Sequence, residues 1–467
     1  MLKSSNLTLH ILLIFSGFLL PQQNQDFFYK GADVSFLSQT ESGGAVYKIS
    51  GVPVDALAAL KESGINTVRL RLWNNPQNGY SNMNDLLYLA RRAKNLGLRL
   101  MLDFHFSDTW ADPAHQTIPS AWQNISFSSL TDSVREFSGN TIMRLRSEGI
   151  IPDIVQPGNE ISCGMLWNHG NVCGEYNNPL QWSRLVQLIN ASAEGIRSAL
   201  APGESVKIMI HSERSGDLPA AQWFFTNLIN YGAQFDIIGL SYYPWWHGRP
   251  ETLNSNMQSL AQNYDKELII TETAYPFTTA WYDTTHNIVG PSTPLLPDYP
   301  ASVAGQKEFI ENLIGITASL PGNKGKGVFY WAPEYISSPG FGSSWENLAL
   351  FDFAGNILTS AYAFQYIPSS AEHESEFKNL PDFTLFQNYP NPFNPETQIK
   401  YTLQKPDFVS IKVYDVRGEL KTVLQNSFLS AGKYSIHYDA SELSSGVYFL
   451  VLQTGSSAKS IKMTLIR

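Results

Sequence analysis

Cysteine is scarce in this sequence, with only Cys163 and Cys173 among 467 residues. Two cysteines alone cannot supply the ligand set of a structural metal centre, so a cysteine-based metal domain is excluded. Their short separation favours a disulfide if the chain is exported, and two unpaired thiols are the alternative.

Positive charge is also limited, because 32 basic residues stand against 41 acidic ones and the formal charge is -9. Nucleic-acid binding needs a basic surface, so this balance disfavours nucleic acid as a partner. Hydrophobic residues make up 43% and charged residues 16%, which predicts a globular chain with a large core. The length predicts one large domain and one small one.

Long apolar runs are missing except near the N-terminus. There Leu9–Leu20 is almost wholly apolar, follows a segment that carries Lys3 and no acid, and precedes the polar Gln22–Gln25. A run of this length is too short to span a bilayer and is typical of a signal peptide, which we predict over residues 1–25. An uncleaved lipid-anchor helix is the alternative.

A glycine-rich phosphate loop is absent too, since "GADVSFLSQ" stands where such a loop would follow the first β-like run. From residue 29 to about 366, short apolar or β-branched runs alternate with amphipathic helical stretches. There are eight such runs: Tyr29–Val34, Thr67–Leu72, Arg99–Phe104, Asp153–Gln156, Val206–His211, Asp236–Tyr242, Glu267–Thr271 and Gly327–Trp331. They predict a parallel sheet closed into a (β/α)8 TIM barrel over residues 26–367, with an open doubly wound sheet as the alternative.

The composition changes after the barrel. Residues 368–382 are polar and bounded by proline, which predicts a linker. Residues 383–467 contain alternating strands between turn signals such as "VRGE", "SAGK" and "SSGV", and no tryptophan. They predict a small all-β sandwich.

Polar side chains gather where the predicted barrel strands end, which is where a parallel barrel carries its functional groups. Asn159 and Glu160 follow the fourth strand, and Glu272 follows the seventh. A carboxylate pair across a barrel mouth is what glycoside hydrolysis needs, with retention at about 5–5.5 Å and inversion at about 6.5–9.5 Å. A helix-capping role for Glu160 and a salt-bridge role for Glu272 are the structural alternatives.

Several motifs at these strand ends carry a family resemblance. "RLRLWNNP", "LDFHFSDTWADP", "VQPGNEIS", "GLSYYPWW", "ITETAYPF" and "VFYWAPEYI" resemble the endo-β-1,4-galactanases of glycoside hydrolase family 53, over Tyr29–Phe364. The resemblance implies retaining endo-hydrolysis of β-1,4-galactosidic bonds in (arabino)galactan through a covalent glycosyl-enzyme. Glu160 would be the acid/base and Glu272 the nucleophile.

The resemblance also implies substrate contacts. Asn159 would bond the sugar 2-hydroxyl, and Arg71 would orient the nucleophile and keep it ionised. Trp110, Trp246 and Trp331 are candidate stacking platforms for the galactose ring. Asp33 and Asp108 either bind sugar hydroxyls or brace Arg71. The residues expected to line the catalytic subsite are His105, His211 and Tyr242.

Two features depart from the family pattern or extend it. The family usually has a glutamate where Ala332 stands, and here Glu334 lies two residues on. The resemblance implies no required cofactor but leaves room for a structural calcium, for which the loop "WYDTTHNIVG" offers Asp283, His286 and Asn287. Calcium prefers more carboxylates than this loop contains, and a solvated loop is the alternative.

The C-terminal segment resembles the C-terminal sorting domain of the bacterial type IX secretion system, through "FQNYPNPFNPETQIKYTL" and the strands after it. The resemblance implies export through the periplasm and outer membrane to the cell surface or medium, with the secretion machinery as partner. A sugar-binding sandwich is the alternative, disfavoured because the segment lacks tryptophan.

For the whole chain we expect a monomer whose substrate is galactan. The alternative functions are another retaining β-glycanase, acting on mannan or a β-glucan, and a non-catalytic galactan-binding surface protein.

Overall fold

The computed structural model describes residues 27–368, 383–403, 407–429, 432–454 and 458–467. The chain divides into two compact units, residues 1–368 and residues 369–467. The predicted signal peptide and almost all of the predicted linker lie outside the described residues. Within the described ranges, no helix has the length and apolar character needed to cross a membrane.

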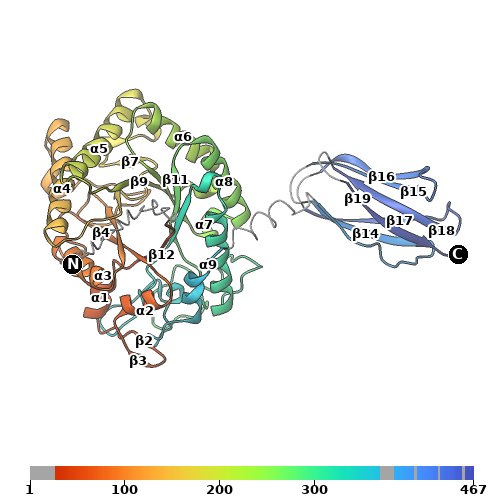
Figure 1. The fold of residues 1–467 in the computed structure, drawn as a ribbon, viewed down its shortest axis with the longest axis horizontal. Helices are drawn as coiled ribbons and strands as arrows, with labels where there is room; N and C mark the ends of the chain where they lie inside the picture. The colour runs from red at the N-terminus through yellow and green to blue at the C-terminus, as the bar shows by residue number, and fades with distance from the viewer. Residues whose placement is uncertain (1–26, 369–382, 404–406, 430–431, 455–457) are drawn as a thin grey trace, which may run out of the picture. The chain divides into compact units, whose positions relative to one another are not determined.

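Eight parallel strands close into a barrel in the first unit, which confirms the predicted (β/α)8 TIM barrel (Figure 1). Every strand overlaps one of the eight runs that the sequence indicated. In ring order they are β1 (Tyr29–Asp33), β4 (Thr67–Leu72), β5 (Arg99–Phe104), β6 (Ile154–Pro157), β9 (Lys207–Ser212), β10 (Ile237–Tyr242), β11 (Glu267–Thr273) and β12 (Gly325–Trp331).

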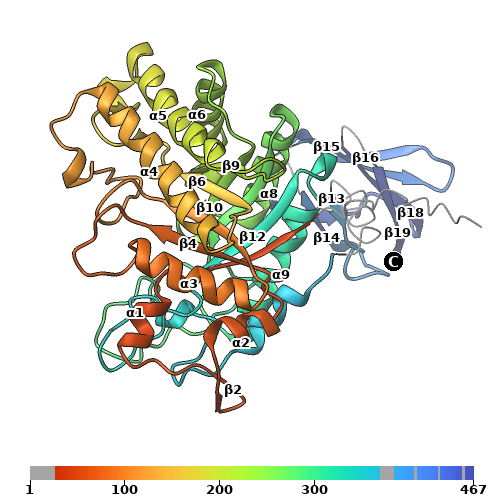
Figure 2. The same ribbon diagram turned by 60° about the vertical axis from the view of Figure 1, so that its left-hand side comes forward.

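Helices form an outer ring around these strands (Figure 2). They are α1 (Leu37–Ser42), α2 (Ala56–Glu62), α3 (Met83–Asn95), α4 (Phe127–Ser147), α5 (Pro179–Ser198), α6 (Leu218–Asn230), α7 (Pro244–His247), α8 (Pro250–Asn263) and α9 (Val303–Ala318). Six begin after a residue whose side chain accepts from free N–H groups of the first turn: Asp55, Asn82, Ser126, Asn178, Asp217 and Ser302. Two short hairpins, β2 (Lys48–Ile49) with β3 (Val52–Pro53) and β7 (Gly164–Met165) with β8 (Gly170–Asn171), lie in the connections.

The barrel interior is filled in layers, because every second residue of a strand points to the same side. The lowest layer is an apolar cluster of Tyr29, Met101, Ile154, Met209, Ile237, Ile269 and Phe329. Gly31 leaves room for one of these rings, since a Cβ at Gly31 would lie 2.0 Å from Phe329. Farther along the strands the inward residues become polar. A polar layer of side chains therefore lies on the mouth side of the apolar cluster.

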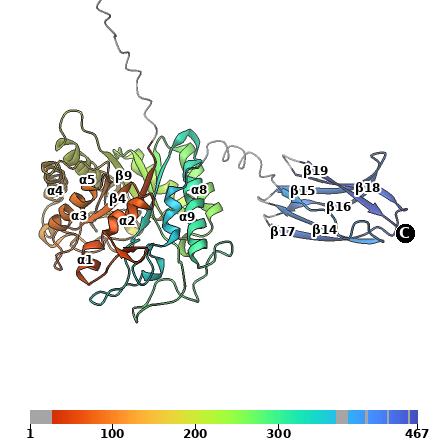
Figure 3. The ribbon, with the colours of Figure 1, turned by 60° about the horizontal axis from the view of Figure 1, so that its bottom comes forward.

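The second unit is an all-β region of antiparallel strands, in agreement with the predicted sandwich (Figure 3). One sheet contains β13 (Phe383–Leu385), β14 (Glu396–Leu403) and β17 (Gly432–Asp439). The other contains β15 (Asp407–Asp415), β16 (Leu420–Leu429), β18 (Gly446–Gln453) and β19 (Ala458–Leu465). Alternating residues such as Val409, Ile411 and Val413 are fully buried in one shared core, which is the pattern of a half-buried sheet.

Candidate active site

The C-terminal ends of the barrel strands surround a cavity of about 460 Å³, which we call the active-site cleft. Glu160 and Glu272 both line it, so the two carboxylates predicted from the sequence face one space. The other lining residues are Asp33, Arg69, Arg71, Asp103, His105, Trp110, Ala111, Asp112, Pro113, Asn159, Glu213, Tyr243, Trp246, His247, Trp331 and Trp345.

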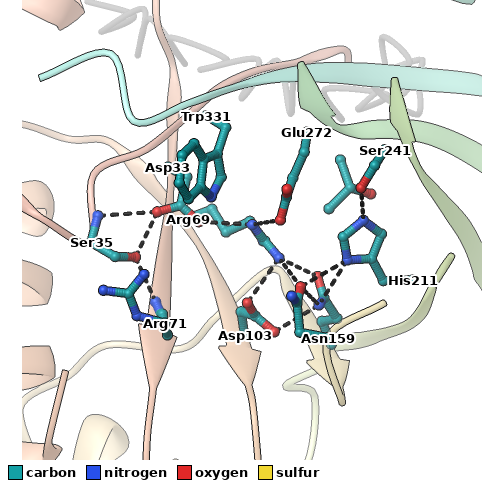
Figure 4. Close-up of polar contacts among 12 residues, drawn as sticks. Asp33, Ser35, Arg69, Arg71, Asp103, Asn159, His211, Ser241, Glu272 and Trp331 are labelled. Carbon is teal, nitrogen blue, oxygen red and sulfur yellow. Dashed lines mark hydrogen bonds and ion pairs between the residues drawn. The ribbon is translucent and has the colours of Figure 1, made fainter. Parts of the chain in front are cut away.

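Arg69 lies buried at the centre of the polar layer (Figure 4). Its Nη1 donates to Asp33 Oδ2 at 2.8 Å and to Glu272 Oε1 at 2.7 Å, and its Nη2 donates to Asp103 Oδ2 at 2.8 Å. Burial opposes the charge, but the three carboxylates outweigh it and raise the pKa of Arg69 above its ordinary value. Arg69 is therefore a permanent cation that fixes the position of Glu272.

The prediction that Arg71 orients the nucleophile is wrong, because Arg69 makes that contact. Both side chains point inward from β4, but Arg71 lies two residues, or about 7 Å, nearer the mouth. There its guanidinium packs over the rings of Phe36, Trp73 and Trp110, with centroid distances of 4.9, 4.6 and 4.0 Å. Arg71 lines the cleft as an aromatic-caged cation, and Asp33 braces Arg69 rather than Arg71.

A β-bulge directs Glu272 into the barrel. Between β10 and β11, Leu240 pairs with Ile270 but Ser241 pairs with Glu272, so Thr271 is an extra residue. The side chain of Thr271 reaches Met209 in the interior, and without the shift Glu272 would point outward toward the helices. The bulge therefore lets two successive residues face the inside of the barrel.

Glu272 has the partners of an ionised carboxylate. Besides Arg69, the hydroxyl of Tyr243 donates to its Oε2 at 3.1 Å. Burial raises the pKa of Glu272 to about 7, while the charge of Arg69 opposes that rise. Glu272 thus shares the Arg69 cation with Asp33 and Asp103.

Glu160 lies in the turn after β6, where its backbone takes the left-handed conformation with φ of 48°. For a residue other than glycine this costs about 1–2 kcal/mol, which is typical of functional turns. Its Oε1 lies 2.5 Å from Ser241 Oγ. Burial and then the charge of Glu272 raise the pKa of Glu160 well above its ordinary value. This carboxyl has no ion-pair partner among the described residues.

The two carboxyls therefore differ in their surroundings. Glu272 bonds a cation and a hydroxyl donor, and Glu160 bonds a hydroxyl in a desolvated position. Such a difference assigns separate roles, because a protonated acid and an ionised carboxylate can coexist near neutral pH. The arrangement can deliver a proton and a nucleophile, or a proton and a base, to one bound molecule.

His105 and Asn159 complete the polar layer. Ala111 N donates to His105 Nδ1 at 3.0 Å, so the proton of neutral His105 lies on Nε2, 3.1 Å from Asp103 Oδ2. The amide nitrogen of Asn159 donates to Ala111 O at 2.9 Å, and its Oδ1 accepts from Arg69 at 2.9 Å. Both side chains line the cleft, as predicted for substrate-binding residues.

Three predicted substrate contacts are corrected, because the side chains do not line the cleft. Tyr242 points outward from β10, packs on Phe309 of α9 and donates to Gly248 O at 2.8 Å. His211 is fully buried below Ser241 and supports other side chains. Asp108 accepts from backbone and hydroxyl groups of the loops around it, and so braces them.

Aromatic side chains form the walls of the cleft. The predicted platforms Trp110, Trp246 and Trp331 all line it, and Trp246 is 59% exposed. Trp345 packs edge-on against Trp331 with ring centroids 4.6 Å apart, which holds Trp331 upright. Exposed indole faces beside a polar floor suit a ligand with both apolar C–H faces and hydroxyl groups.

Glu334 does not occupy the place of the family glutamate at Ala332. It is fully buried behind the cleft, where its Oε1 accepts from Phe36 N at 3.1 Å. Burial raises the pKa of Glu334 well above its ordinary value and so favours its neutral form.

The loop that was expected to hold calcium contributes few carboxylates. No group of three or more His, Cys, Asp or Glu side chains is arranged for a metal within the described ranges. Asp283 Oδ1 accepts from Thr285 N at 2.6 Å, and the ring of His286 packs on Trp281. Asn287 is buried beside Glu346, its Nδ2 lying 3.3 Å from Glu346 Oε1.

Cys163 and Cys173 form a disulfide with Cα atoms 5.1 Å apart. The bridge closes the loop that follows Glu160 and contains the hairpin of β7 and β8.

Sequence reasoning missed Ser241, Tyr243 and Trp345. Ser241 and Tyr243 share the inward alternation of β10, and that signal could have separated them from Tyr242. Trp345 lies in the connection after β12, where no periodicity marks a residue that folds back over the cleft.

Comparison with known proteins gives two family matches. Residues 29–364 match the model described as glycosyl hydrolase family 53, and residues 387–467 match the secretion system C-terminal sorting domain. The second match indicates type IX secretion to the cell surface or extracellular space of a bacterium.

Several relatives cover most of the first unit. An arabinogalactan endo-β-1,4-galactanase of Thermothelomyces thermophilus is 34% identical over 73% of this chain and 99% of its own. An endo-β-1,4-galactanase of Bacillus subtilis is 32% identical over 74% of this chain and 79% of its own. The solved GH53 catalytic domain of Ignisphaera aggregans superposes with a TM-score of 0.68 at 34% identity, covering 75% of this chain and 98% of that one.

Proposed function

Because the chain belongs to glycosyl hydrolase family 53, we propose that it hydrolyses the β-1,4-galactosidic bonds of (arabino)galactan internally and with retention. The observation that carries the proposal is the pair of unlike carboxyls in one cleft. Glu272 bonds Arg69 directly, whereas Glu160 is half-buried and has no ion pair among the described residues.

In the first step Glu272 attacks the anomeric carbon while Glu160 protonates the departing oxygen. The glycosidic C–O bond breaks, and a galactosyl–Glu272 ester forms. In the second step water attacks the same carbon, Glu160 takes its proton, and the ester bond to Glu272 breaks. Two inversions at one carbon retain its configuration.

Other cleft residues bind the sugar in this proposal. Asn159 donates or accepts at the 2-hydroxyl beside the reacting carbon, and His105 faces the same floor. Trp110, Trp246 and Trp331 stack on galactose rings along the chain. We also propose that the enzyme acts as a monomer.

Digestion of purified polysaccharides tests the function. We expect potato or lupin galactan to yield oligosaccharides early and in a range of sizes, because an open cleft admits internal bonds. Mannan and mixed-linkage β-glucan should yield no reducing ends above background. Preferential hydrolysis of either one would assign a different substrate, and galactan binding without hydrolysis would make the protein a binding module.

We propose domain limits that follow the folded units. Residues 1–25 would be removed on export, residues 26–367 form the catalytic barrel, and 368–382 connect it to the sorting domain at 383–467.

We further propose that the loop around Asp283 holds a structural calcium ion. If Asn287 Nδ2 donates to Glu346 Oε1, the amide oxygen faces the carbonyl oxygens of Thr285 and Ser343, 3.3 and 3.2 Å away. Three facing oxygens repel one another unless a cation lies between them, and Asp283 supplies a carboxylate beside Gly342. The alternative is a rotated amide that donates to both carbonyls. The ring of His286 would not be a ligand.

Calcium is expected to raise the unfolding midpoint of the wild-type protein by about 2–5 °C over the value in EDTA, because it binds only the folded state. Asp283→Asn should abolish this difference. Asp265→Asn removes a fully exposed carboxylate that the loop does not contact, and should leave the calcium effect intact. An equal midpoint in calcium and EDTA for the wild type would favour the rotated amide.

A further inference from the structure

A buried chain of hydrogen bonds runs from Arg69 through Asn159 and His211 to Ser241 (Figure 4), and Ser241 contacts Glu160. Arg69 Nη2 lies 2.9 Å from Asn159 Oδ1, which lies 3.0 Å from His211 Nδ1. His211 Nε2 lies 2.9 Å from Ser241 Oγ, and Ser241 Oγ lies 2.5 Å from Glu160 Oε1. His211 and Ser241 are both fully buried, so solvent does not reach the contact between them.

The direction of the chain is set at Asn159. Its amide nitrogen donates to Ala111 O at 2.9 Å, which fixes Oδ1 on the side of Arg69 and His211. A carbonyl oxygen only accepts, so the Nδ1 of His211 must carry a proton.

Gln156 does not reverse this assignment, although its Nε2 lies 3.2 Å from His211 Nδ1. That nitrogen has other acceptors, at 2.7 Å in Asp103 Oδ1 and at 3.1 Å in Gly158 O. The two N–H groups of the Gln156 amide are satisfied by these two oxygens. Gln156 therefore needs no acceptor on the imidazole.

His211 is neutral in this position. Burial first, and then the charge of Arg69, lower the pKa of His211 well below its ordinary value. With its single proton on Nδ1, Nε2 can only accept, so the hydroxyl of Ser241 donates to it. The remaining lone pairs of Ser241 then face Glu160, which can bond them only by donating its own proton.

We propose that Ser241 and His211 are positioning residues that hold Glu160 as the protonated acid, an inference that rests on the catalytic role proposed above. When Glu160 gives its proton to the departing oxygen, the hydroxyl of Ser241 must turn from His211 to the new carboxylate. The proton of the attacking water later restores the first arrangement. No proton passes through His211.

The two acidic neighbours of Glu160 also favour its protonated form. Glu272 on β11 and Glu213 after β9 repel a carboxylate at Glu160, while the cation Arg69 on β4 favours it. The hydroxyl of Tyr243 is bonded to Glu272 rather than to Glu160. His211 itself is faced by Arg69, Asp103 and His105.

The direction in which the alkaline limb of the pH dependence of kcat/KM moves in a Ser241 variant tests the proposal. In Ser241→Ala, the protonated state loses two hydrogen bonds, from Glu160 to Ser241 and from Ser241 to His211. The ionised state loses only the bond from Ser241 to the carboxylate, so Glu160 should ionise at lower pH. The alkaline limb of the pH dependence of kcat/KM on galactan should move down by about 0.5–1 pH unit. If Ser241 instead donates to an ionised Glu160, its removal would move the limb up. A limb that rises or stays in place overturns the proposal.

Two further variants distinguish a specific effect on Glu160 from a general loss of folded structure. His211→Phe leaves Ser241 free to donate to the carboxylate, and should move the limb in the same direction. Ser215→Ala removes a buried hydroxyl that donates to Ser241 O at 2.6 Å but does not touch Glu160, and should leave the limb unchanged. Unfolding midpoints show whether each variant is folded.

A titration of Glu160 tests the role of Ser241 and His211 independently of the proposed hydrolysis of galactan. Its side-chain carboxyl can be followed by ¹³C NMR in the intact protein, with Glu160→Gln to assign the signal. If the wild type does not hydrolyse galactan, the proposed function fails. A lower titration midpoint in Ser241→Ala would still support the proposed direction of the bonds, and an equal or higher one would overturn it.

Discussion

Glu272→Ala is expected to lower kcat/KM on galactan by about 10⁴-fold or more, because the variant lacks the carboxylate that forms the covalent intermediate in the proposed mechanism. Azide should restore part of the turnover of an aryl β-1,4-galactobioside by entering the space that the carboxylate leaves. It would attack from the face opposite the leaving group, so the product should be an α-galactosyl azide, identified by NMR. Glu272→Ala with full activity would refute the assignment.

Glu160→Ala is the matched control for this experiment. An aryl leaving group needs little protonation, so the galactosyl–Glu272 ester should form and accumulate. Azide would then attack the ester from the face where water normally enters, and two inversions give a β-galactosyl azide. Opposite anomers from the two variants distinguish nucleophile from acid/base, whereas the same anomer from both would contradict the proposed division of roles.

The fold could be predicted because its signals are local and repeated. Strand-like runs alternate with helical stretches eight times, and each strand of the barrel overlaps one of these runs. Polar side chains at the ends of the runs were enough to place Glu160 and Glu272 at one rim. Neither prediction depends on the details of packing.

The sequence alone does not show which of two nearby side chains on a strand contacts Glu272 or lines the cleft. Arg69 and Arg71 share one face of β4, and only depth in the barrel decides which meets Glu272 and which meets the tryptophans. The inward direction of Glu272 depends on the bulge at Thr271. No turn residue in the sequence predicts this bulge. The resemblance implies Tyr242 as a lining residue, whereas the alternation of inward and outward residues puts Tyr243 inside.

Arg69→Met is expected to lower the free energy of unfolding by about 3–5 kcal/mol, because it leaves buried carboxylates without their cation. Asp33, Asp103 and Glu272 all bond this guanidinium within 2.8 Å. Burial favours the neutral form of Asp103, but Arg69 outweighs it and lowers the pKa of Asp103 below its ordinary value. Denaturant unfolding would measure the loss.

Arg91→Met is the matched control, since Arg91 pairs with Glu148 at 2.7 Å while its side chain is 50% exposed. The free energy of unfolding should change far less than in Arg69→Met, because solvent screens an exposed ion pair. An equally small loss for Arg69→Met would mean that the buried cluster is not held by its cation.

The pH dependence of stability and of kcat/KM in the Arg69→Met protein should also reflect the loss of the cation beside Asp103 and Glu272. The folded-state pKa of Asp103 lies below its unfolded value in the wild type, so its contribution to stability is present at neutral pH and is lost as the pH falls. Without Arg69, burial raises the pKa of both Asp103 and Glu272, and protonation at low pH relieves the penalty. The stability difference between wild type and variant should therefore narrow on acidification, and the acidic limb of kcat/KM should move to higher pH. An acidic limb that stays in place would show that Arg69 does not keep Glu272 ionised, and the nucleophile would then need another source of charge stabilisation.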